Sequence, residues 1–182
     1  MFAEKNKRRI ISNNRKEVVK MERKELPFRK NTEGYFLDEN NQVLALDSGK
    51  GYPIFPGGGV DDGETPEEGM VRELFEETGA IINGKVINIG VIRLVWGEGW
   101  AKTEKQKERY EKFQGDEMHF FCGMIAGFSG RKSTEEDVWQ GEKLMPISRA
   151  IQLIESGRPF DKDIAAYREM QLKCLKSLQE KK

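Results

Sequence analysis

The sequence lacks a net charge, is poor in cysteine and contains a single histidine, and each shortage excludes a class of protein. Its 31 Lys and Arg residues balance 31 Asp and Glu residues, so the totals do not support a bulk affinity for nucleic acid or an anionic membrane. Cys122 and Cys174 have neither metal-site spacing nor the density of a secreted disulfide scaffold, so we expect buried thiols. His119 has no nucleophile-and-base pattern near it, which disfavours a serine or cysteine hydrolase and favours a structural role.

Long hydrophobic runs are missing as well. Behind the basic N-terminus the apolar stretch consists of Ile10 and Ile11 alone, far shorter than a signal-peptide core or a membrane span. We therefore expect a soluble, cytoplasmic protein that does not bind a membrane. At 182 residues, the chain is expected to form a single domain around one well-buried core.

Hydrophobic patterning indicates a mixed α and β chain. Residues 32–38 and 42–47 are short apolar runs separated by a polar turn, which predicts a hairpin. Residues 85–96 and 118–126 are rich in Val, Ile and Phe, and we expect them to be neighbouring strands joined by a long connection. Residues 17–26 are a further strand candidate.

Three helices are predicted. Thr65 can cap the first one, Pro66 occupies its first position, Glu68 completes a capping box and Gly79 supplies a left-handed stop, so the helix should span residues 66–78. The second is predicted over residues 148–157. The third should begin near Asp161 and present one apolar stripe formed by Ile164, Tyr167, Cys174, Leu175 and Leu178.

The first helix has an acidic face. At about 100° per residue, Glu73, Glu76 and Glu77 fall within roughly 100° of arc. Such close carboxylates repel each other unless a hard divalent cation lies among them, and oxygen ligands favour magnesium or manganese. An ordinary solvated helix face is the alternative. The opposite side is expected to pack in the core through Val71, Leu74, Phe75 and Thr78.

A glycine-rich loop, residues 55–64, leads into this helix. The spacing is Gly58, five residues, Glu64, seven residues, Arg72-Glu73-Leu74, one residue, Glu76-Glu77, one residue and Gly79, which resembles the Nudix box. At roughly one chance in 20 per fixed letter, a coincidence at a given start is on the order of 10⁻⁹. The one departure is Ala80, where the family usually has a larger aliphatic residue, and we expect only a packing adjustment there.

The resemblance is close over residues 58–80 and looser over residues 32–156. It implies an α/β (α+β) fold of the Nudix type, which is an α/β/α sandwich with a mixed sheet and a catalytic loop and helix. We expect an N-terminal extension over residues 1–26, a Nudix hydrolase domain over residues 27–159, and a C-terminal helix within residues 160–182 packed on the same domain.

The implied activity is Mg²⁺-dependent hydrolysis of a phosphoanhydride bond in a nucleoside diphosphate linked to another moiety, with more than one Mg²⁺ during turnover and Mn²⁺ as a substitute. The glycine turn, Gly57, Gly58 and Gly59, is expected to contact this cofactor. By resemblance, the metal ligands are the Gly57 carbonyl and the side chains of Glu73, Glu76 and Glu77.

Further roles also follow from the resemblance. Arg72 is expected to orient Glu73 by a charge-assisted hydrogen bond, with a pairing to Glu68 as the alternative. Glu64 should brace the loop against the helix or join the metal shell. The general base stays open: Glu73 or Glu77 could serve from the helix, and a later loop offers Glu136, which we prefer, then Glu142, with Glu135 also nearby.

Substrate clues are weaker. The connection over residues 97–116 is long, and it is either a basic and aromatic lid or a solvated helix with ion pairs such as Glu108 to Lys112. Trp96 and Tyr35 are candidates for stacking on a base, although aromatic residues near strands are usually core.

A proline typical of ADP-ribose hydrolases and a tyrosine typical of dinucleoside-polyphosphate hydrolases have no counterpart about 15 residues past the box, which leaves a nucleoside triphosphate or a modified nucleotide. We expect a small nucleotide-type substrate and no stable nucleic-acid partner, and a homodimer stays open. Two alternative functions are a regulatory domain that binds a nucleotide or metabolite, and an RNA 5′-end pyrophosphohydrolase.

Overall fold

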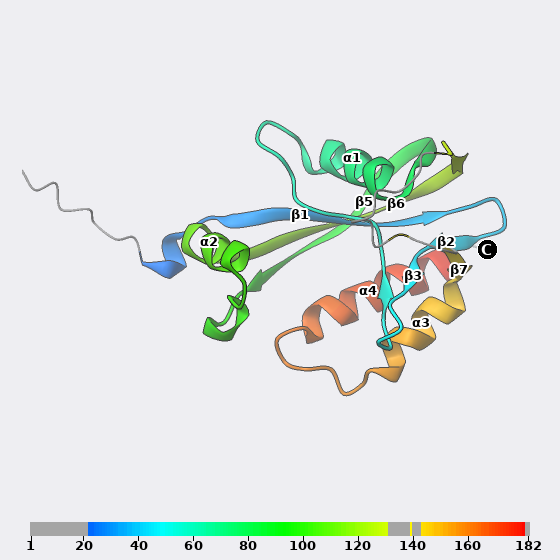
Figure 1. Ribbon diagram of the computed structural model, residues 1–182. Helices are drawn as coiled ribbons and strands as arrows, with labels where there is room; N and C mark the ends of the chain where they lie inside the picture. The colour runs from blue at the N-terminus through cyan, green and yellow to red at the C-terminus, as the bar shows by residue number, and fades with distance from the viewer. Residues whose placement is uncertain (1–21, 131–138, 140–142, 181–182) are drawn as a thin grey trace, which may run out of the picture.

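The computed structural model describes residues 22–130, 139 and 143–180. Its centre is a five-stranded mixed sheet in the order β5-β6-β1-β2-β7 (Figure 1). The parallel pair in this sheet is β1 with β6, and the other neighbours are antiparallel. The strands are β1 (Phe28–Leu37), β2 (Gln42–Leu44), β5 (Ala80–Val95), β6 (Gly115–Phe128) and β7 (Leu144–Pro146). A separate two-stranded sheet pairs β3 (Leu46–Asp47) with β4 (Pro53–Ile54).

Helices cover both faces of the large sheet, which gives the predicted α/β/α sandwich (Figure 1). On one face lies α1 (Pro66–Thr78), and on the other lie α3 (Ile147–Ser156) and α4 (Ala165–Gln179). The long connection between β5 and β6 contains a 3-10 turn, η2 (Glu98–Trp100), and α2 (Glu104–Lys112). Another 3-10 turn, η1 (Arg23–Glu25), precedes β1.

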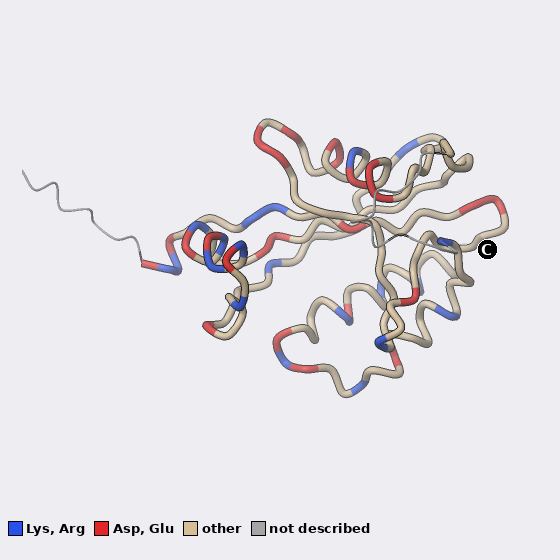
Figure 2. The backbone as a smooth tube through the Cα atoms, viewed as in Figure 1, with Lys and Arg blue, Asp and Glu red and all other residues tan. Residues whose placement is uncertain are grey.

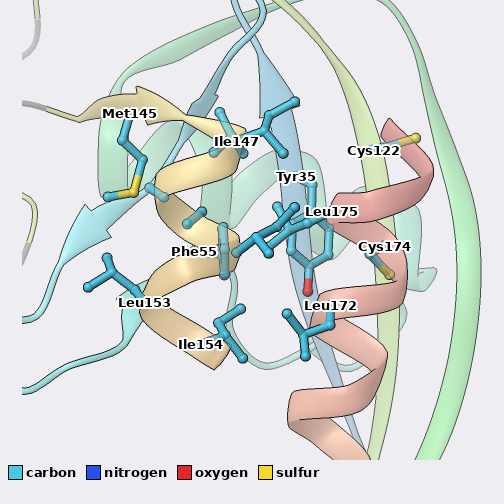
Figure 3. Close-up of a cluster of buried hydrophobic side chains, with 14 of the residues drawn as sticks. Tyr35, Phe55, Cys122, Met145, Ile147, Leu153, Ile154, Leu172, Cys174 and Leu175 are labelled. Atoms are coloured by element: carbon cyan, nitrogen blue, oxygen red, sulfur yellow. The ribbon is translucent and has the colours of Figure 1, made fainter. Parts of the chain in front are cut away.

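Each face of the sheet has its own apolar core. The larger core lies between the sheet and the α3–α4 pair, where Tyr35, Phe55, Ile154 and Leu175 pack together (Figure 3). Both cysteines are buried and free, as predicted. The smaller core, beneath α1, contains Phe36, Leu44, Met70, Leu74, Ala80, Phe121, Ile125 and Trp139. Because a sheet with two apolar faces must bury both, this arrangement explains why the central strand β1 is buried continuously from Asn31 to Leu37.

The first helix begins and ends where its sequence predicts. The Thr65 hydroxyl accepts a hydrogen bond from the Glu68 amide, the Glu68 carboxylate accepts one from the Thr65 amide, and Gly79 adopts the left-handed conformation at φ 68°. The expected core face was partly wrong, because Val71 and Phe75 are 39% and 43% exposed. Residues four apart lie in one line along a helix, and here the buried line is Met70, Leu74 and Thr78.

Other boundaries differ from the predictions. The strand expected over residues 17–26 is wrong at its C-terminal end, because a reciprocal hydrogen-bond pair between Glu22 and Glu25 closes η1 instead; residues 17–21 lie outside the described residues. Helix α3 begins one residue early, and α4 begins at Ala165 because a turn over residues 162–164 precedes it. Ile164 is consequently 44% exposed, and Leu172 joins the buried stripe in its place. Within the part of the chain that the structure describes, no helix is both long and apolar enough to cross a membrane.

The packing of α1 gives a stability test. Leu74 is fully buried beneath the helix, so Leu74→Ala should lower the free energy of unfolding by about 2–5 kcal/mol through lost burial and the cavity left behind. The matched control is Val71→Ala on the exposed side of the same helix, which should change stability by less than about 0.5 kcal/mol. Urea unfolding of both variants measures the difference, and equal losses would contradict this orientation of α1.

Candidate functional site

The glycine-rich loop runs along β1 almost as an additional strand. The amide of Thr32 donates to the Gly58 carbonyl at 2.8 Å, Gly34 donates to Pro56 at 2.9 Å, and Val60 donates to Lys30 at 3.1 Å. A Cβ atom at Gly57 would overlap the carbonyl oxygen of Thr32, and one at Gly58 would overlap the carboxylate of Glu73. The two glycines are therefore required for the loop to lie between β1 and α1.

Arg72 ties this loop to the acidic helix. Its guanidinium donates a hydrogen bond to each carboxylate oxygen of Glu64, from Nε to Oε1 at 2.8 Å and from Nη2 to Oε2 at 2.9 Å. It also donates to the Gly59 carbonyl at 2.8 Å, to Glu73 at 3.0 Å and to Glu76 at 3.2 Å. The Arg72–Glu73 hydrogen bond is the one that the resemblance implied. The alternative partner, Glu68, is held by Thr65 in the helix cap.

The charges of this pair are strongly coupled. The bidentate hydrogen bond from Arg72, together with the Asp61 amide, lowers the pKa of Glu64 to about 2. The same carboxylate raises the pKa of Arg72 above its already high value. Both groups are thus ionised throughout the neutral range, and Glu64 braces the loop with both of its oxygens facing Arg72.

Two of the three glutamates predicted as metal ligands, Glu73 and Glu77, contact the glycine turn. Glu73 is largely shielded, with 19% of its side chain exposed, and rests against Gly58. Glu77 accepts a hydrogen bond from the Gly57 amide at 2.9 Å. Glu76 is more open, at 52% exposure. Acidic residues gather on the loop before α1 and on α1 itself, whereas α2 carries both signs (Figure 2).

These residues fit a hard divalent cation by their chemistry. All three side chains offer carboxylate oxygens, and the space in front of the Gly58 α-carbon is filled by the Glu73 carboxylate rather than by a side chain of the loop. Across the described ranges, no group of three or more acidic, cysteine or histidine side chains forms a ready-made metal cluster. Metal binding at this site would therefore require Glu76 and Glu73 to exchange part of their contact with Arg72 for the cation.

Comparisons with known proteins agree with this loop and helix. A family model described as "NUDIX domain" matches residues 27–167. The chain belongs to this family. In solved structures, the MutT protein from Bacillus halodurans superposes with a TM-score of 0.51 and 21% identity over 80% of this chain and 82% of its own, which supports the shared Nudix fold.

Two curated relatives match parts of the chain. A Bacillus subtilis (strain 168) protein named "Putative 8-oxo-dGTP diphosphatase" is 40% identical over 103 residues, covering 53% of this chain and 55% of the relative. A Tolumonas auensis "RNA pyrophosphohydrolase" is 53% identical over 53 residues, covering 29% of this chain and 30% of the relative. The chain thus spans about half or less of the length of these two relatives.

Sequence reasoning missed a polar row on β1 that faces the Nudix loop. Arg29 lies against Gly59 and hydrogen-bonds the side chain of Asn31, which in turn hydrogen-bonds Asp116 on β6. Asp116 also accepts a hydrogen bond from the Trp96 indole at 2.8 Å. The available signal was the unbroken polar run over residues 29–33 at the start of an apolar strand, in which every second residue lies on the same face.

Other candidates have structural positions. Tyr35 is fully buried and Trp96 is 6% exposed, stacked on Trp100 at 3.7 Å between ring centroids, so both belong to the packed interior as the alternative stated. His119 lies 3.0 Å from Glu117, in keeping with a structural role.

Residues 104–112 of the 97–116 connection form the largely exposed helix α2, and the lid interpretation stays a prediction. The ion pair of this helix joins Lys107 to Glu104 at 2.7 Å rather than Glu108 to Lys112. Glu135, Glu136 and Glu142, the later-loop candidates for a general base, lie outside the described residues.

The Glu64–Arg72 pair predicts a specific pH dependence. Because the folded-state pKa of Glu64, about 2, lies below its ordinary value of 4.5, its stabilising effect is fully present above about pH 4.5 and is lost as the pH falls through about 2. In urea unfolding, Glu64→Gln should therefore be less stable than the parent near neutral pH, and the difference should shrink on acidification through this window. Glu67→Gln, on the exposed side of α1, is the control, and a Glu64→Gln deficit independent of pH would refute the assignment.

Proposed function

We propose that the chain is a Mg²⁺-dependent Nudix pyrophosphohydrolase that splits a phosphoanhydride bond in a nucleoside diphosphate linked to another moiety. A nucleoside triphosphate or a modified nucleotide is the proposed substrate class. The observation that supports this most directly is the position of Glu73 and Glu77 at the backbone of the glycine turn, with Arg72 joining the turn to the helix. Hydrolysis of such anhydrides requires a cation beside the diphosphate, and this is where the chain concentrates oxygen ligands.

The proposed metal ligands are the carboxylates of Glu73, Glu76 and Glu77 and the carbonyl of Gly57. When bound, Mg²⁺ neutralises the diphosphate and lowers the pKa of a coordinated water, and Mn²⁺ can supply the same chemistry. The chain's own part is positioning. Arg72 holds Glu73 and Glu76 from one side, and Glu64 prevents that guanidinium from turning away, because both of its oxygens face Arg72.

The candidates for the general base are the glutamates that the sequence offered for this role. Glu73 and Glu77 lie next to the glycine turn and could accept the proton of an attacking water, and Glu136 or Glu142 are the candidates from the later loop. A base must come within hydrogen-bond reach of that water. Glutamine variants at Glu73, Glu77 and Glu136, compared by their pH–rate profiles, separate a base from a metal ligand, because only loss of the base removes the acidic limb while metal affinity is kept.

Glu76 gives the sharpest test of the metal role. Its side chain is half exposed, so Glu76→Gln should leave the fold intact while it removes a charged metal ligand. We expect Mg²⁺-dependent release of phosphate or pyrophosphate from a panel of nucleoside triphosphates to fall by about 100-fold or more, beyond the 10–100-fold typical of losing an outer-shell partner.

Two controls accompany the Glu76 experiment. Glu67→Gln lies on the same helix, away from the glycine turn, and should retain activity. EDTA should abolish turnover by the parent protein. Full activity of Glu76→Gln at low Mg²⁺ would refute the proposed ligand set, and activity of the parent in EDTA would refute the metal requirement.

A second candidate is hydrolysis at the 5′ end of RNA. It is favoured by the local similarity to a protein named RNA pyrophosphohydrolase, whereas the zero net charge of the chain disfavours a phosphate-tracking surface. The two candidates differ in a competition assay. If small nucleotides are the substrates, a 5′-triphosphorylated RNA at equal concentration should slow nucleotide hydrolysis by less than about twofold at 150 mM salt, whereas strong inhibition with pyrophosphate release from the RNA would favour the second candidate.

A further inference from the structure

A pocket of about 320 Å³ opens beside the glycine turn, between β1 and α4. Gly57 and Gly58 form one end, so the pocket adjoins the proposed metal site directly. Thr32 and Glu33 line its sheet side, and Tyr52, Tyr167 and Arg168 line the other sides. The volume is at the lower end of the roughly 300–1,000 Å³ that small-ligand sites occupy. It suits a single nucleobase with part of its sugar, with the phosphates directed toward Gly57 and Gly58.

Glu33 anchors α4 to the floor of this pocket. The carboxylate is 5% exposed and receives hydrogen bonds from the hydroxyl of Tyr35 at 2.6 Å, from the amide of Gln171 at 3.0 Å, and from the hydroxyl of Tyr167. These donors already surround the carboxylate. Glu33 therefore holds the wall of the pocket in place instead of serving as a free acceptor for a ligand.

Arg168 is the group that can read a ligand. Its guanidinium donates to the Gln171 side-chain oxygen at 2.7 Å, and the Gln171 nitrogen donates to Glu33, so the orientation of the amide is set by the buried carboxylate. The same guanidinium lies 4.8 Å from the centre of the Tyr52 ring. Within the described ranges, its direct contacts are this amide and the rings of Tyr52 and Tyr167. The rest of its N–H fork is available at the pocket wall.

The pocket thus offers the N–H donors of Arg168 to a ligand, whereas the Glu33 carboxylate is already hydrogen-bonded within the protein. A planar guanidinium pairs best with two acceptors on one edge of a ligand, as in the O6 and N7 atoms of a 6-oxopurine. A 6-aminopurine has a donor in place of O6, so one N–H of the fork would face another N–H. Tyr52 also lines the pocket, with the guanidinium over its ring, so a base that pairs with the fork lies close to both side chains.

We propose that this pocket binds the nucleobase of the substrate and that Arg168 selects 6-oxopurines over 6-aminopurines. The proposal rests on the proposed function for the direction of the phosphates, but base selection itself does not require hydrolysis. Arg168 and Gln171 also lie beyond residue 167, where the match to the family model ends. The selecting residue would therefore be a property of this chain's C-terminal helix rather than of the shared domain.

The test compares two nucleotides that differ at the purine 6 position. Inosine and adenosine 5′-monophosphates are titrated into the full chain without divalent cations, and binding is followed by NMR amide shifts. The parent should bind inosine monophosphate at least about fivefold more tightly. Arg168→Gln should remove the preference, and Arg168→Lys should reduce it, because lysine keeps the charge but lacks the planar fork. The matched control is Arg158→Gln, whose guanidinium is held by Glu169 at 2.8 Å outside the pocket.

Each outcome of the titrations either supports or overturns base selection by Arg168. Equal losses of affinity for both nucleotides in Arg168→Gln would mean that Arg168 contacts phosphate, which overturns base selection. Equal binding of the two nucleotides by the parent, or no binding of either, overturns it as well. If the preference is present but triphosphates are not hydrolysed with Mg²⁺, the proposed function fails and the base site stands. If triphosphates are hydrolysed without any such preference, the reverse holds.

Discussion

The arrangement of the site depends on one guanidinium, that of Arg72, and on the negative groups that share it. The first turn of α1 is held by its own cap, and Glu77 near the end of the helix accepts a hydrogen bond from the Gly57 amide. The rest of the glycine-rich loop has to be joined to Glu73 and Glu76. Arg72 does this by bonding Glu64 and the Gly59 carbonyl on the loop side and Glu73 and Glu76 on the helix side. The positive charge of Arg72 also offsets part of the repulsion among Glu64, Glu73 and Glu76, which share its guanidinium.

The glycine turn is also constrained by the limited space between β1 and α1. Backbone hydrogen bonds with β1 hold Pro56, Gly58 and Val60 against the strand, and only a residue without a Cβ at position 58 leaves room for the Glu73 carboxylate on the other side. The strand, the turn and the helix are thus closely packed at this point. A substitution at Gly58 would displace an acid that the proposed chemistry needs, and a shift of β1 would move the glycine turn that lies against the same acid. Packing and chemistry are therefore constrained together at this point.

What could be predicted from the sequence was whatever depends on neighbours along the chain. The bounds of α1 follow from Thr65, Pro66, Glu68 and Gly79, which act within a few residues of each other, and the structure matches them. The parallel pairing of β1 with β6 joins residues more than 80 positions apart, and no local pattern encodes it. The contact of Asn31 with Asp116 was missed for that reason, because it crosses from β1 to β6. The error at Val71 and Phe75 has a related cause: their burial depended on which side of the helix meets the sheet, and apolar character alone did not decide it.

The same difference separates the residues proposed to hold the metal from those proposed to bind the base. The residues proposed to hold the metal fall within one segment, residues 57–77, so their spacing is visible in the sequence. The pocket beside them is assembled from β1, the segment around Tyr52 and α4. Its donor Arg168 is oriented by Gln171, which is held in turn by Glu33, 138 positions before Gln171. A chain can change those distant contributors without disturbing the loop and helix, because Glu33 and Arg72 belong to separate hydrogen-bond networks among the described residues. The family of such a protein can therefore be predicted from a short motif, whereas its preference for a base depends on a helix that lies outside that motif.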